Sequence, residues 1–117
     1  MSLSCWNCRG AGKPATVREL RDFARQFAPL VLCIVETQLP RDRVENLAST
    51  LGYDNSFAVS SSGRSGGLGI FWNNEIKIEN FGYSAYHIDA HVTMPGAPPW
   101  RLTVMYGEAQ VSDRGKT

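Results

Sequence analysis

The sequence predicts an α/β fold of mixed (α+β) type, in which strands and helices alternate first and strands follow one another afterwards. Residues 3–7 and 30–35 are strand candidates on either side of a helical pattern, which is the order of a βαβ unit. After residue 68, four strand candidates are separated by short turns, a spacing typical of an antiparallel meander. With 117 residues the chain is predicted to form one domain with a modest core.

The first helix is predicted between the turn residues 10–14 and Pro29. Thr16 and Glu19 have capping-box spacing. An apolar stripe follows at helical intervals, formed by Val17, Leu20, Phe23, Ala24 and Phe27. Residues 30–35 are apolar at every position, which predicts a central parallel strand covered on both faces.

A second helix is predicted over residues 40–51, with Asp42 and Glu45 at capping-box spacing and Gly52 just beyond its end. Residues 53–60 are weakly extended, and residues 60–67 form a polar, glycine-rich loop.

The remaining strand candidates are residues 69–72, 76–81, 87–93 and 100–106. Apolar and polar side chains alternate in the second and third of them, as expected of half-buried strands. Residues 107–117 are polar without an apolar period, so no element is predicted there.

Charge and hydropathy exclude few functions. The net charge is +1 and the pI is near 7.7, which neither indicates nor excludes nucleic acid as a partner. The longest apolar run, residues 30–35, is shorter than the roughly 18 residues of a membrane span. The N-terminus lacks the pattern of a secretory signal, and three cysteines do not suggest paired disulfides. An intracellular protein with reduced thiols is expected.

Cys5 and Cys8 have the spacing of a zinc half-site or of a redox pair. A zinc site would need further ligands, and Cys33, His87 and His91 are predicted on other strands. A redox pair would normally open a helix. The favoured interpretation is therefore that the cysteines are small buried side chains.

Two glycine-rich stretches resemble phosphate loops only in part. Gly10, Gly12 and Lys13 lack the Ser or Thr that a Walker motif requires after its lysine. Residues 63–69 precede a strand rather than a helix, so they are read as a surface loop, although Arg64 could contact a phosphate backbone.

Asn7 and Glu36 form the main candidate site. Parallel strands of a βαβ unit place their carboxyl ends side by side, so Asn7 and Glu36 should lie close together. An amide and a carboxylate are suitable ligands for Mg²⁺. The alternatives are that Arg9 or a capping role balances the charge of Glu36, and that Asn7 only bonds local backbone groups.

Two further positions have both a chemical and a structural reading. Tyr106 ends the last strand candidate, where a tyrosine is ordinarily a core residue with a solvated hydroxyl. His87 and Asp89 lie two residues apart on one strand face. They could handle a proton together, but a solvated strand face is favoured because Ile88 and Ala90 supply the apolar side.

Four motifs in a fixed order resemble the endonuclease/exonuclease/phosphatase superfamily. They are W-N-C-R-G at 6–10, V-E-T at 35–37, G-G-L-G-I-F-W at 66–72 and L-T-V-M-Y-G at 102–107. The chain is most similar to the apurinic-type endonuclease domain of plant LINE-type (non-LTR) retrotransposons.

The resemblance implies a four-layer, DNase I-like α/β sandwich with a metal-dependent site for phosphodiester cleavage. Asn7, Glu36 and Tyr106 would be catalytic, with Glu36 and Asn7 at an Mg²⁺ or Mn²⁺ ion and Tyr106 on a substrate phosphate. Beside these implied roles, Arg9 and Arg64 are candidate nucleic-acid contacts on account of their own charge and place. DNA is the implied partner, with no membrane and no organic cofactor, and a nuclear location is one interpretation.

The sequence departs from the family pattern at two places. Many members carry an acidic or amide residue where Arg9 stands, and the later acid-base motifs of the family do not follow Tyr106. The sequence thus resembles the N-terminal half of such a domain, from which we expect weak or no cleavage, a largely missing facing sheet and aggregation. The alternatives are a non-catalytic nucleic-acid-binding remnant that uses Arg9, Lys13 and Arg64, and a phosphatase of the same superfamily.

Overall fold

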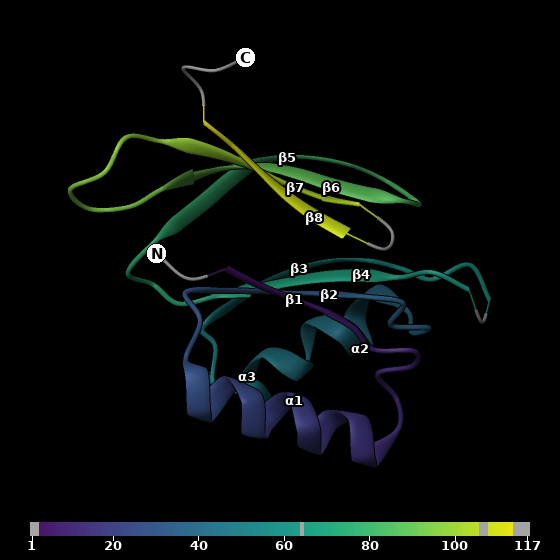
Figure 1. Cartoon of the computed structure of the whole chain (residues 1–117). Helices are drawn as coiled ribbons and strands as arrows, with labels where there is room; N and C mark the ends of the chain where they lie inside the picture. The colour runs from purple at the N-terminus through teal and green to yellow at the C-terminus, as the bar shows by residue number, and fades with distance from the viewer. Residues whose placement is uncertain (1–2, 64, 106–107, 114–117) are drawn as a thin grey trace.

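The computed structural model describes residues 3–63, 65–105 and 108–113. Within these residues the chain forms two four-stranded sheets and three helices. Figure 1 shows the layers: the helices cover one sheet from below, and the second sheet lies on its other face. This arrangement confirms the predicted mixed α/β class with two facing sheets.

The first sheet has the strand order β1-β2-β4-β3. Its strands are β1 (Leu3–Asn7), β2 (Val31–Val35), β3 (Asn55–Val59) and β4 (Leu68–Trp72). β1 and β2 pair in parallel, which confirms the predicted βαβ unit. β4 pairs antiparallel with both β2 and β3, so the prediction that it begins the meander is wrong. All five residues of β4 are buried, because β4 is a central strand that is covered on both faces.

The second sheet is an antiparallel meander of β5 (Lys77–Ser84), β6 (His87–Thr93), β7 (Trp100–Met105) and β8 (Glu108–Asp113). β8 pairs with β7 along its whole length, so the prediction of no element after residue 107 is wrong. An edge strand needs only main-chain partners on one side, and a weak apolar pattern suffices for it. The expectation that most of the facing sheet would be missing is corrected as well.

The first helix, α1, spans Pro14–Phe27. Lys13 is its N-cap and makes no side-chain cap bond, so the predicted capping box at Thr16 is wrong. Proline is well suited to the first helical position, because its missing N–H would be unpaired there in any case. The helix ends at Ala28, whose N–H donates to the Ala24 carbonyl oxygen at 2.9 Å.

The predicted second helix is interrupted at Asn46 into α2 (Arg41–Glu45) and α3 (Leu47–Leu51). Pro40, and not Asp42, occupies the N-cap of α2, so this capping box is wrong too. Gly52 ends α3 with φ +87°, as predicted. No helix in the described ranges is long and apolar enough to cross a membrane.

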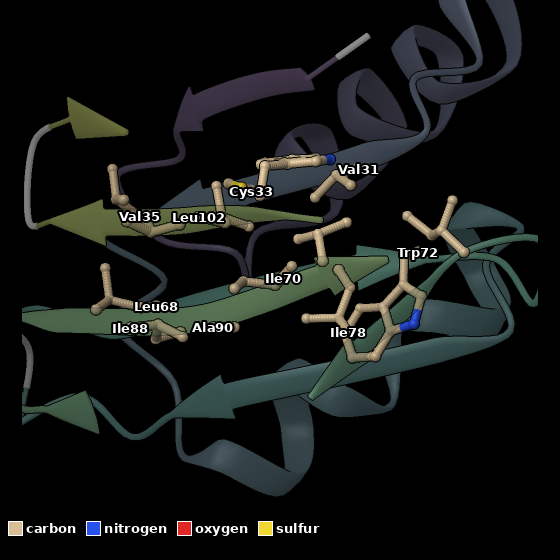
Figure 2. Packing of buried hydrophobic residues seen from close by; sticks show 14 residues of the cluster. Val31, Cys33, Val35, Leu68, Ile70, Trp72, Ile78, Ile88, Ala90 and Leu102 are labelled. Atoms are coloured by element: carbon tan, nitrogen blue, oxygen red, sulfur yellow. The ribbon is translucent and has the colours of Figure 1, made fainter. Parts of the chain in front are cut away.

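Two apolar clusters hold the three layers together. The first lies between the two sheets, and Figure 2 shows its side chains, among them Cys33, Ile70 and Ile88. The second lies between the helices and the first sheet, and includes Leu20, Leu32 and Phe71. Burying each such large side chain stabilises the fold by about 1.5 to 3 kcal/mol. The apolar inner faces of both sheets are therefore covered, whereas a largely missing facing sheet would have left the first sheet uncovered on one face.

Both sheets share one end, which we call the rim. In Figure 2, Val35, Leu68 and Ile88 lie at one end of the core, while Trp72 and Ile78 lie at the other. The first group marks the carboxyl end of β2, the start of β4 and the start of β6. The rim thus gathers the loops after β1 and β2, the loop before β4 and the β5–β6 turn.

Candidate active site

Asn7 and Glu36 lie side by side at the rim because β1 and β2 remain paired beyond their last residues. Asn7 is the partner of Val35 in the parallel register. Past the strand ends, Gly10 N donates to the Glu36 carbonyl oxygen at 2.9 Å and Ala11 N donates to the Thr37 carbonyl oxygen at 2.8 Å. Asn7 is exposed and Glu36 is half-buried. The predicted proximity of these two residues is confirmed.

The backbone at the rim adopts a conformation that side chains disfavour. Arg9, Glu36 and Gln38 have φ values of 51°, 55° and 58°, and they make up three of the five non-glycine residues with positive φ in the described ranges. A left-handed conformation costs such a residue roughly 1 to 2 kcal/mol. Strain of this kind is concentrated at ligand sites, where the surrounding structure holds it in place.

The opposite side of the loop after β2 is fixed by two glycines before β4. Thr37 N donates to the Gly67 carbonyl oxygen at 3.2 Å, and Gln38 N donates to that of Gly66 at 2.9 Å. A Cβ atom on Gly67 would lie 2.1 Å from Thr37 Oγ1, and Thr37 is fully buried. Sequence reasoning assigned no role to these residues, although V-E-T and G-G-L-G were recognised as motifs. The sequence does not show that these two motifs lie next to each other across the sheet.

The structure does not gather the cysteines with further ligands in the part of the chain that it describes. All three are free thiols, with Cys5 exposed and Cys8 and Cys33 buried. Burial, then the charges of Cys5 and Glu36, raise the pKa of Cys8 to about 12. Burial also raises the pKa of Cys33. The described ranges contain no group of three metal-binding side chains of the His, Cys, Asp or Glu type. The interpretation as buried side chains is confirmed for Cys8 and Cys33 and wrong for Cys5.

His87 and Asp89 have separate partners on the outer face of the second sheet. Asp89 accepts hydrogen bonds at 2.9 Å from Arg101 Nε and from Thr103 Oγ1, and the hydrogen bond from Arg101 is the main cause that lowers its pKa. His87 Nδ1 lies 2.6 Å from Ser84 Oγ. The favoured interpretation as a solvated strand face agrees with this arrangement.

The basic residues and the tyrosine of the predicted site are only partly described. Arg9 and Lys13 are exposed on the loop between β1 and α1, which starts at the rim. Arg64 and Tyr106 lie outside the described residues, so their predicted roles stay predictions.

The rim residues fit a divalent cation in part. Mg²⁺ is usually held by one or two carboxylates, with waters and substrate phosphates completing its shell. Glu36 supplies one carboxylate and Asn7 one amide oxygen, both of the hard donor type that this ion prefers. The donor set therefore suits an ion that is completed by substrate rather than a closed protein cage.

The sequence pattern of the endonuclease/exonuclease/phosphatase family matches residues 5–113. The chain belongs to this family. No curated protein matches the sequence. The four motifs named above fall within the matched range, so the resemblance seen in the sequence is confirmed at the level of the family.

Solved structures share the fold. An AP endonuclease from Archaeoglobus fulgidus is 15% identical with a TM-score of 0.64, over 91% of this chain and 40% of its own. The AP endonuclease LMAP from Leishmania major is 20% identical with a TM-score of 0.61, over 87% and 38%. The 3′ phosphatase NExo from Neisseria, solved with a product DNA hairpin, is 18% identical with a TM-score of 0.60, over 91% and 41%. The chain thus spans about two-fifths of the length of these structures.

Proposed function

We propose that this chain forms part of a divalent-metal-dependent site that cleaves phosphodiester bonds in DNA. The observation that carries the proposal is the continued main-chain pairing between residues 7–11 and 35–37, which brings Asn7 beside Glu36 in a strained loop. Family membership supports the same chemistry.

Each residue of the rim has a proposed role. Glu36 would hold the Mg²⁺ or Mn²⁺ ion, and the Asn7 amide would orient the phosphate or the shell of the ion. When bound, the ion would supply Lewis-acid stabilisation of the phosphate and of the leaving oxygen. Arg9 follows Asn7 at the rim, and its guanidinium suits a phosphate oxygen of the substrate.

Tyr106 and Arg64 complete the proposal from the sequence motifs alone. Tyr106 would donate its hydroxyl to a substrate phosphate oxygen, and Arg64 would contact the nucleic-acid backbone. The order of the motifs favours the LINE retrotransposon branch of the family, and a nuclear location would suit that branch.

We propose that the 117 residues by themselves cleave DNA weakly. The resemblance places further acid-base groups of the family after Tyr106, and loss of such groups lowers rates by about 10² to 10⁴. The same 117 residues would then act chiefly by binding nucleic acid through Arg9, Lys13 and Arg64.

A phosphatase is the second candidate, because the Neisseria structure with the same fold is a 3′ phosphatase. The two candidates differ in substrate, and a 3′-phosphorylated oligonucleotide separates them. Release of phosphate without cleavage of internal bonds would favour the phosphatase.

The first experiment follows nicking of a supercoiled plasmid with Mg²⁺ or with EDTA. We expect slow Mg²⁺-dependent nicking that Glu36→Gln reduces to the level with EDTA, because the amide removes the charge that holds the ion. Glu75→Gln is the control, since Glu75 is exposed in the turn between β4 and β5, away from the rim.

A binding measurement makes the test independent of activity. Mn²⁺ should broaden the NMR signals of residues next to Glu36 in the original chain and in Glu75→Gln, but not in Glu36→Gln. Nicking or broadening that Glu36→Gln leaves unchanged would contradict the assigned role of Glu36.

A further inference from the structure

Two exposed tyrosines lie on the hairpin that reaches the rim. Tyr83 is 59% exposed near the end of β5, and Tyr86 is 69% exposed in the turn before β6. Figure 1 shows this turn at the same end of the molecule as the loop between β3 and β4. Exposed aromatic rings beside a candidate site commonly bind a ligand, because each offers a large rigid surface.

Tyr83 rests on a packed aromatic base. Its ring meets Phe57 edge-on at 5.6 Å between centroids, and Phe57 stacks on Phe81 at 4.1 Å. The guanidinium of Arg41 covers the Phe57 ring at 5.2 Å and also bonds Glu45. A shift in register between Glu79 and Gly82 separates Phe81 from the regular pairing of β5 with β6. Tyr83 is therefore held in place on one side and open to solvent on the other.

The turn that carries Tyr86 is fixed by Ser84. The Ser84 hydroxyl oxygen accepts a hydrogen bond from Tyr86 N at 3.1 Å and lies 2.6 Å from His87 Nδ1. A preorganised turn loses less conformational entropy when its side chain binds a ligand. Tyr86 is thus presented to solvent by a defined backbone.

The position of the tyrosines relative to Glu36 suits a nucleic-acid strand. Phe57, which supports Tyr83, lies on β3, two strands from β2. Its register runs through Ile70 to Cys33, three residues before Glu36. The tyrosines are therefore separated from Glu36 both across the first sheet and along its strands, so a ligand that reaches both must be extended. Tyrosine rings stack on any nucleobase face, and Arg9 and Arg41 add cations that suit a phosphate backbone.

We propose that Tyr83 and Tyr86 form a stacking surface for unpaired nucleobases of a strand whose phosphate lies at Glu36. The chain would then prefer substrates with a single-stranded or distorted segment over regular duplex. This inference rests on the proposed function, since it assigns a substrate class to the same site.

The test measures binding of a single-stranded oligonucleotide that carries 2-aminopurine, and of a matched duplex, at low salt with EDTA. Tyr83→Ala and Tyr86→Ala should each weaken binding of the single strand by about 5- to 100-fold and change duplex binding less than twofold. Tyr86→Trp should retain affinity and quench the fluorescent base. Phe27→Ala is the matched control, because Phe27 is also 59% exposed but ends α1 at the opposite end of the sheet.

The outcomes separate the inference from the proposed function. If both alanine variants bind the single strand as the original chain does, while Glu36→Gln still abolishes nicking, only the stacking surface is wrong. If the original chain binds neither oligonucleotide, both proposals are wrong. If the variants change self-association and not oligonucleotide binding, the tyrosines contact protein and the inference is overturned.

Discussion

At the level of single residues, the rim is shaped by backbone conformation as much as by side chains. Glu36 keeps its left-handed φ of 55° because hydrogen bonds hold both neighbouring segments. Gly10 N binds its carbonyl oxygen, and the next residue, Thr37, is fixed to Gly67. Glycine at position 36 would relieve the strain but would remove the carboxylate. The carboxylate that we propose as the ligand of the ion therefore lies on strained backbone.

Gly67 should be the most sensitive glycine of the rim. Its φ is +94°, and a Cβ atom would collide with Thr37 Oγ1. We expect Gly67→Ala to lower the free energy of unfolding by about 2 to 5 kcal/mol, because strain and overpacking add. Gly52→Ala is the matched control, since Gly52 has φ +87° and open space around it. It should lose only about 1 to 2 kcal/mol, the cost of the left-handed backbone alone. Urea unfolding of both variants measures the difference. Equal losses of unfolding free energy would show that the contact with Thr37 adds no cost.

At the level of elements, β6 and β7 are linked on their outer face by Asp89, Arg101 and Thr103. Arg101 bonds both carboxylate oxygens of Asp89, and Thr103 donates to one of them. Because Asp89 pairs directly with Thr103 in the register, this cluster supports the pairing of the two strands. It stands apart from the core, which lies on the other face of the sheet.

The pH dependence of stability should reveal this cluster. Arg101 lowers the pKa of Asp89 in the folded chain. The stabilisation is therefore present above the pKa of an unfolded aspartate, about 3.9, and is lost as the pH falls through the lower, folded value. Asp89→Asn should reduce the melting temperature at pH 7 by about 1 to 3 °C, because exposed ion pairs are weak.

The difference between Asp89→Asn and the original chain should disappear at the acid end of a melting series from pH 7 to pH 2. Asp22→Asn, an exposed change on α1, serves as the control. A difference that stays constant with pH would mean that the carboxylate charge is not the source.

Helices and strands were predictable from the sequence where their apolar residues follow one another closely. The apolar run of β2 and the stripe of α1 identified the βαβ unit with nearly correct bounds. The predicted capping boxes were wrong, because Pro14 is the first residue of α1 and Pro40 is the N-cap of α2. β4 was placed in the wrong sheet, because an apolar strand does not indicate which sheet it joins. β8 was missed because its strand pairing depends on β7 and not on its own pattern.

At the level of the whole molecule, the two sheets place the rim loops at the same end. Topology alone allowed the prediction that Asn7 and Glu36 meet, because any βαβ unit brings its strand ends together. The tyrosine hairpin and the glycine pair of the rim could not be predicted in this way. They depend on how the second sheet aligns with the first and on left-handed backbone that a residue such as Glu36 rarely adopts.

The open sheet edges should govern how the chain behaves in solution. In the described ranges, β1 pairs only with β2, and its sequence LSCWN carries no charge. An uncharged edge strand exposes unpaired main-chain groups and favours pairing with another copy. We therefore expect concentration-dependent self-association, which sedimentation velocity between micromolar and millimolar protein would detect.

Ser4→Lys should reduce this association, because a charge on β1 opposes pairing between edges. Ser49→Lys is the control, since Ser49 is exposed on α3 and lies on no sheet edge. A chain that stays monomeric at millimolar concentration would contradict the expectation. Association that both lysine variants weaken equally would indicate a general effect of charge.

Association through the β1 edge would leave Tyr86 accessible, because β1 and β5 lie on opposite sides of the sandwich, each as an edge strand. Oligonucleotide affinity should then not depend on Ser4→Lys.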